Sequence, residues 1–391
     1  MAKLTVNQTL LKAKSHEKKG EIEEAQKYYK IVLDMFPKNK RAQLGLINLK
    51  RPNKNSVTTN PPQDIIKQLI NLYNQGQFQL VVEHSQKLLK QHSKAFVIWN
   101  ILGAAHKSLG NIDKASLAFK KTTELNPNFA DGYNNLGASL HNQGMLKESM
   151  MAYHKAISLR PNYVEAYSNL GVLLQENGKI KEAIESYKKA ISINPDYAEA
   201  HNNIGNAFRD QAKLKEAIGA YNRAISIKPD YAEAYCHMGI ALNDQGKLNE
   251  SIEAYEKATT YKPSYIEAWT NGAEALEKWN RLSQLEDWLK QAFESFKVIP
   301  ADILYLQSKL LWRNKEFQKA FDLISTINDE FIAEKRKQDY FNLKAKCFES
   351  LKQYANAYKY FSKMNSVTKK TADFTMHNPK AFLQNRKNQL A

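Results

Sequence analysis

The sequence predicts an all-α solenoid made of repeated antiparallel helix pairs, and three observations support this fold class. Prolines recur every 34 residues, at Pro127, Pro161, Pro195, Pro229 and Pro263. Glycines keep the same step, at Gly103, Gly137, Gly171, Gly205 and Gly239. Between these markers the apolar residues follow helical spacing, with room for two helices in each period. A fixed period of this length is typical of stacked repeats, in which each unit packs on its neighbours.

The repeat units begin at residues 96, 130, 164, 198, 232 and, more weakly, 266. We call the first helix of each unit helix A and the second helix B. A second glycine series, in which Ala212 fills one place, marks the turn between them: Gly76, Gly110, Gly144, Gly178 and Gly246. Each of the last three prolines is followed directly by an aspartate or a serine, and a glutamate comes three residues after that. These pairs predict capping boxes at the start of helix A: Asp196 with Glu199, Asp230 with Glu233, and Ser264 with Glu267.

The order of residues within one unit identifies the type of repeat. It reads Trp99-x-x-Leu102-Gly103, then Ala115-x-x-x-Phe119, then Pro127. Later units place a tyrosine where the first has Phe119. This pattern resembles the tetratricopeptide repeat, which implies a superhelix with helix A on its concave face and helix B on its convex face. We expect the glycine to let helix A approach its neighbour closely, and the aromatic ring to fill the gap between units.

The flanks depart from the regular pattern. Residues 1–50 form an isolated helical unit, with Gly20, Ala25, Tyr29 and Pro37 at the expected spacing. Residues 51–62 read RPNKNSVTTNPP, which is typical of a linker. The superhelix is predicted over 63–299, with its best units in 96–265. Residues 300–391 are expected to form degenerate helix pairs followed by a basic helix that begins near Asn378 and Pro379.

The net charge of +17 is distributed unevenly. Residues 1–61 and 300–391 each carry an excess of eight positive charges, whereas 96–299 are close to neutral. An RNA-binding protein would interleave aromatic and basic residues on one face, which this sequence does not do, so we do not expect a nucleic-acid partner. Two distant cysteines support neither a disulfide framework nor a zinc site, and no segment reads as a signal peptide or membrane span. We therefore expect a cytoplasmic protein without a membrane partner.

A polar position recurs on helix A, two residues before the glycine place. We call its occupants the ladder residues: Asn135, Asn169, Asn203, His237 and Asn271. One interpretation is that asparagine is merely tolerated on a solvated face. The other is a peptide-binding groove, because carboxamides both donate to and accept from an extended backbone. A similar ladder occurs in the superhelix of O-GlcNAc transferases. We place Asn206, Asp210 and Asp244 in the same predicted groove.

A terminal-carboxylate clamp, a metal site and a catalytic site are three other functions to compare with peptide binding. A clamp for a terminal carboxylate needs several converging basic residues, and only Lys107 and Arg209 are candidates, so we do not expect one. The histidines lack metal-ligand spacing, and no phosphate-binding loop or nucleophile motif occurs. The prediction is therefore a protein that is not an enzyme, needs no cofactor and serves as an interaction scaffold for a protein or peptide segment.

One alternative function stays open. The chain could be the substrate-recruiting arm of a transferase, of the sulfotransferase or O-GlcNAc type, that lacks its catalytic domain. The ladder favours this hypothesis, as does the stretch from Tyr340 to Leu390, which resembles the helical segment joining such repeats to a sulfotransferase domain. A catalytic domain would then act in trans.

Overall fold

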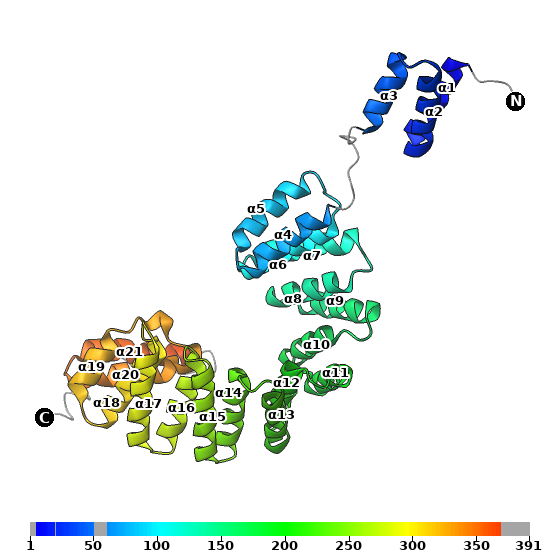
Figure 1. Cartoon of the computed structure of the whole chain (residues 1–391). Helices are drawn as coiled ribbons and strands as arrows, with labels where there is room; N and C mark the ends of the chain where they lie inside the picture. Colours follow the sequence, from blue (N-terminus) through cyan, green and yellow to red (C-terminus); the bar gives the residue numbers. More distant parts are fainter. Residues whose placement is uncertain (1–4, 20, 51–60, 369–391) are drawn as a thin grey trace. The chain divides into compact units, whose positions relative to one another are not determined.

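The computed structural model describes residues 5–19, 21–50 and 61–368, and every regular element in these ranges is a helix (Figure 1). The all-α prediction is confirmed. The helices fall into two units, residues 1–159 and 160–391, which are described separately. The greater part of the predicted linker 51–62 and the predicted basic helix near Asn378 lie outside the described residues.

The first unit contains nine described helices. Three belong to the isolated N-terminal module and six to the repeats: α1 (Val6–Lys19), α2 (Ile22–Met35), α3 (Lys40–Lys50), α4 (Gln63–Asn74), α5 (Phe78–Leu89), α6 (Phe96–Ser108), α7 (Ile112–Leu125), α8 (Ala130–Asn142) and α9 (Leu146–Leu159). In the module, the buried ring of Tyr29 packs against Gly45 of α3, where a Cβ would lie 2.4 Å from the ring. Helix α3 thus adds a third helix to the predicted pair.

The second unit continues the repeats and ends in less regular helices: α10 (Val164–Glu176), α11 (Ile180–Ile193), α12 (Ala198–Asp210), α13 (Leu214–Ile227), α14 (Ala232–Asp244), α15 (Leu248–Tyr261), α16 (Ile266–Lys278), α17 (Leu282–Ser295), α18 (Ala301–Arg313), α19 (Phe317–Ser325), α20 (Lys337–Ser350) and α21 (Tyr354–Thr368). Two 3₁₀ turns, η1 (Asp329–Phe331) and η2 (Glu334–Arg336), join α19 to α20. From α4 to α17 the even-numbered helices are helix A and the odd-numbered ones helix B.

In the repeats from α6 to α17, a glycine of helix A packs against the aromatic ring of its own repeat. A Cβ on Gly171 would lie 2.4 Å from the ring of Tyr187, and one on Gly205 would lie 2.6 Å from that of Tyr221. The ring was expected to fill the gap between units, and it also fills space inside its own repeat, because the glycine's missing side chain makes room for it there. The ring of Tyr221 also reaches the next repeat, where it shares a buried cluster with Ala241.

Two repeats vary this pairing. The repeat that begins at 266 carries the pair one position early, as Gly272 and Trp288. In the repeat of α4 and α5, the buried residues at the equivalent positions are Leu69 and Ser85. The larger side chain there belongs to helix A and the smaller one to helix B. A close-packed interior allows such an exchange as long as the total volume is kept.

The predicted capping boxes were wrong. The N-cap of helix A lies one residue later than these boxes require, at Tyr197, Tyr231 and Tyr265, and none of the three makes a side-chain capping bond. The proline and the acid or serine after it form a turn, which carries the acidic side chain away from the helix amides. The carboxylate of Asp196 pairs instead with Arg223 at 3.1 Å, on α13, the helix B of the same repeat.

Candidate functional site

All eight predicted site residues lie on A helices, and most of them lie in the second unit. Asn135 alone belongs to the first unit, on α8. The others are Asn169 on α10; Asn203, Asn206 and Asp210 on α12; His237 and Asp244 on α14; and Asn271 on α16. We call the surface formed by α10, α12, α14 and α16 the A-helix face.

Four of the ladder residues make the following hydrogen bonds between successive A helices. Asn203 donates from Nδ2 to Oγ of Ser168 at 3.4 Å. Three more bonds connect the same two positions of neighbouring repeats: Asn135 Nδ2 to Asn100 Oδ1 at 3.0 Å, His237 Nδ1 to Asn202 Oδ1 at 2.9 Å, and Asn271 Nδ2 to Cys236 Sγ at 3.8 Å. Each ladder residue is half-buried. The ladder therefore couples adjacent repeats, a role that the sequence analysis did not anticipate.

His237 occupies the one ladder place without an asparagine, and its environment keeps it neutral. Burial, assisted by the nearby Arg209 guanidinium, lowers the pKa of His237 from 6.5 to about 4. The carboxylates of Glu267 and Glu233 oppose this shift only in part. At neutral pH the uncharged ring donates to Asn202, just as an asparagine does in the other repeats.

The core tyrosines fix a second row of polar side chains on the A-helix face. The hydroxyl of Tyr187 donates to Oε1 of Gln175 at 3.0 Å, and Gln175 donates from Nε2 to Asp210 at 2.6 Å. The hydroxyl of Tyr221 donates to Oδ1 of Asn206 at 2.7 Å. The rings come from helix B and pass the glycine of helix A, so the pair that packs each repeat also orients the polar groups of this face.

A cavity of about 360 Å³ opens on the A-helix face around Asn271. We call it the A-groove. Three cations and two carboxylates line it together with neutral side chains: Arg209, Lys278, Lys335, Glu267, Glu274, Asn243, Asn271, Tyr255, Ile240 and Ala275. A groove with carboxamides and charges of both signs can bind a peptide backbone and charged side chains together.

The 3₁₀ turn η2 supplies one residue to the A-groove that the repeat pattern did not indicate. Lys335 lines the groove directly. Its neighbour Arg336 is only 6% exposed, and it donates from Nε to Oε1 of Glu274 at 2.5 Å. Nη1 of Arg336 lies 3.7 Å from Asp302, so this guanidinium connects η2 to both α16 and α18. Neither residue belongs to a repeat, which is why spacing gave no signal for them.

The cysteines are not positioned as reactive groups. Cys236 and Cys347 are both free and buried, and burial raises the pKa of each thiol to about 12. Among the described residues, no three side chains of His, Cys, Asp or Glu are grouped so as to hold a metal ion. No helix in the described part of the chain combines the length and apolarity needed to cross a bilayer.

Comparison with known families identifies the class of protein. The family described as TPR repeat matches residues 103–144, 139–178, 174–211, 205–243 and 241–280, and the family described as tetratricopeptide repeat matches residues 10–49. The chain belongs to the tetratricopeptide repeat family, whose members typically serve as scaffolds for protein interactions. No curated protein matches the sequence.

Solved structures agree with the fold. The hetero-tetramer Cut9–Hcn1 of the APC/C matches 78% of this chain and 55% of its own, with 18% identity and a TM-score of 0.51. The pilF protein of Pseudomonas aeruginosa matches 50% of this chain and 89% of its own at 20% identity and a TM-score of 0.44. MamA matches 42% of this chain and 96% of its own at 27% identity and a TM-score of 0.37. The first likeness shows the fold alone. The transferase-arm alternative is untested and stays a prediction.

Proposed function

We propose that the A-helix face of the second unit binds an extended segment of a protein partner, with the A-groove at one end of the binding surface. The observation that carries this proposal is the A-groove itself. Its three cations, two carboxylates and two carboxamides are supplied by α12, α14, α16 and η2. Polar groups held by rigid helices bind a flexible segment at a lower entropic cost than mobile groups would.

The ladder residues support this function mainly by positioning the A helices. Its Nδ2 groups bond to the preceding repeat, so they hold the A-helix face in register. Affinity for the segment would then come from the remaining carboxamide atoms and from the charges of the A-groove. The chain would act by binding and not by catalysis, as a stacked solenoid offers a long surface more easily than an enclosed pocket.

A selected peptide tests the proposal. Random twelve-residue peptides displayed on phage would be selected on the full chain, and the affinity of the best binder would be measured by fluorescence anisotropy. We expect Lys278→Ala with Lys335→Ala, and separately Asn169→Ala with Asn203→Ala, each to weaken binding by about 1–3 kcal/mol, from about 0.5–1.5 kcal/mol per net hydrogen bond. The matched control is Lys188→Ala with Lys189→Ala, two exposed positions on helix B.

The unfolding midpoint of each variant would be recorded, because the ladder residues also couple repeats. Weakened binding with an unchanged midpoint supports the A-helix face as the site. If the helix B control abolishes binding while both variants of the A-helix face, the lysine pair and the asparagine pair, bind as the unaltered chain does, the proposal is wrong.

A further inference from the structure

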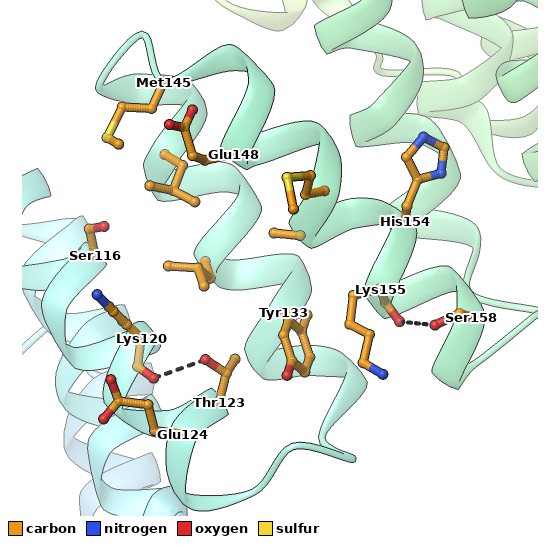
Figure 2. A pocket seen from close by; sticks show the side chains of 14 residues that line it. Ser116, Lys120, Thr123, Glu124, Tyr133, Met145, Glu148, His154, Lys155 and Ser158 are labelled. Carbon is orange, nitrogen blue, oxygen red and sulfur yellow. Dashed lines mark hydrogen bonds between the residues drawn. The ribbon is translucent and has the colours of Figure 1, made fainter.

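A second cavity lies in the first unit, on the side formed by the B helices. It measures about 950 Å³ and lies between α7 and α9, with α8 behind it (Figure 2). Its apolar lining includes Tyr133, Leu136 and Leu140 of α8, together with Met145 and Met151 at α9. Met151 is 72% exposed although it borders a large apolar hollow.

The other repeats show that folding does not require these methionines. The position of Met151 is held by glutamate or glycine in the next three repeats, as Glu185, Gly219 and Glu253. The position of Met145 is held there by lysine, as Lys179, Lys213 and Lys247. Since the same backbone carries charged residues at these places elsewhere, two exposed methionines need a reason other than packing. Methionine adapts its shape to varied apolar surfaces and is common where proteins bind partners.

A neighbouring hollow extends the apolar surface across α7. It measures about 450 Å³ and is lined by Leu89, Trp99, Leu102 and Leu117, among others. Leu117 is 68% exposed and holds the position in its repeat that Met151 holds in the next. The two hollows therefore flank α7, and we call them together the B-groove.

The charges around the B-groove are mostly positive. Lys90 and Lys114 border the smaller hollow, while Lys120 and Lys155 border the larger one. In Figure 2, Tyr133 lies between Lys120 and Lys155. The two carboxylates at the larger hollow are Glu124 and Glu148, and Glu124 is already paired with Lys121 at 3.0 Å. An apolar surface with this border is complementary to an apolar partner that carries acidic residues beside its apolar side chains.

We propose that the B-groove binds an amphipathic helix of a protein partner, with acidic residues flanking the helix's apolar stripe. A helix presents apolar side chains at intervals of three to four residues, so side chains from separate, non-adjacent turns can fill the two hollows on either side of α7. Met145, Met151 and Leu117 contact the stripe, and the four lysines face its acidic flanks. This surface is separate from the A-helix face and does not depend on the function proposed for it.

Two synthetic helical peptides test the inference on the full chain. They share one leucine stripe and differ only in having glutamates or lysines beside it, and binding is followed by fluorescence anisotropy. We expect the acidic peptide to bind at least tenfold more tightly than the basic one. The variant Met145→Lys with Met151→Glu should weaken binding of the acidic peptide at least tenfold. This variant leaves the net charge unchanged, so non-specific attraction to a basic protein would not be affected.

The controls separate the possible outcomes. Both replacement residues occur at the same positions of neighbouring repeats, so the variant should keep its circular dichroism spectrum and unfolding midpoint. Asn169→Ala with Asn203→Ala should bind the acidic peptide normally. The inference is overturned if the methionine variant binds the acidic peptide unchanged, or if the basic peptide binds equally well. It is also overturned if sedimentation shows the unaltered chain to be a dimer that the methionine variant dissolves, because the occupant would then be a second copy of the chain.

Discussion

The regular repeats of the second unit, α10 to α17, and its last helices, α18 to α21, are held together by different forces. In the repeats a glycine on helix A accommodates an aromatic ring of helix B, as with Gly171 and Tyr187. In the last helices buried charges connect segments that share no period. Lys344 is 5% exposed and donates to Asp329 at 2.9 Å and to the hydroxyl of Tyr340 at 2.7 Å.

This difference shows how a stack of similar repeats can end. A repeat is stabilised by neighbours on both sides, so the same few residue types can make the packing contacts in every repeat. The last helices have no following repeat among the described residues, and individual contacts hold them instead. Asp329 also accepts from Lys363, and its lysine partners hold the pKa of its carboxyl below the usual range against the opposing effect of burial. One carboxylate thus joins η1 to α20 and α21.

The largest expected effect is on this charged cluster. Asp329→Ala leaves the buried ammonium of Lys344 without its counter-charge, and removal of one partner of a buried pair typically costs about 3–5 kcal/mol. Denaturant unfolding should show the loss, and hydrogen exchange should show faster opening of α20 and α21 than of α10 to α15. Asp322→Ala, at an exposed position of α19, serves as the control. Equal exchange rates in the altered and unaltered chains would show that the cluster does not hold these helices.

The next effect concerns His237 and acid. Its folded-state pKa of about 4 lies below the ordinary 6.5, so the unfolded chain takes up the proton first as the pH falls. The contribution of the neutral ring is complete above pH 6.5 and is lost towards pH 4, by up to about 3 kcal/mol at 1.36 kcal/mol per pKa unit. His237→Asn restores the residue found elsewhere in the ladder and should flatten this part of the stability profile. If the unaltered chain and His237→Asn lose the same free energy of unfolding between pH 7 and pH 4, the lowered pKa of His237 is wrong.

A third prediction replaces the glycine–tyrosine pair of one repeat with the leucine–serine pair of another. Gly171→Leu forces a side chain into the ring of Tyr187 and should cost about 1–3 kcal/mol. Adding Tyr187→Ser recreates the arrangement of Leu69 and Ser85 and should recover stability, with a coupling of about 1 kcal/mol or more between the two changes. Chemical denaturation of the four chains measures this coupling. Strictly additive losses would mean that the two positions do not share one volume.

The smallest expected effect is at a turn between helices of one repeat. Ala212 has φ of 57°, whereas the glycines at the same place in the other repeats have φ between 72° and 80°. An L-residue with a Cβ is strained there, and glycine is not. Ala212→Gly should therefore stabilise the chain by about 1 kcal/mol or less, seen as a higher unfolding midpoint. The same exchange at Ala220, in the middle of α13, is the control and should destabilise it.

The sequence by itself determined the parts of the fold that depend on neighbours along the chain. The 34-residue period, the helix pairs, the turn glycines and the helix-ending prolines all act within one repeat or between adjacent ones. The eight candidate site residues were likewise placed on A helices correctly, because helical spacing fixes the face on which a residue lies. The N-cap of helix A was misplaced by one residue, since the tyrosine after each proline turn takes the capping position in place of the aspartate or serine.

Only the tertiary structure decided what those residues touch. The ladder bonds join positions 35 residues apart, as from Asn203 to Ser168, and they depend on the offset between stacked helices. Lys335 reaches the A-groove from a turn beyond the repeats, because ion pairs of the buried Arg336 with Glu274 and Asp302 hold η2 against α16 and α18. A periodic sequence pattern indicates contacts that recur in every repeat, whereas the contacts of η2 with α16 and α18 occur once. Their partners are selected by burial and charge in the folded chain, which spacing along the sequence does not record.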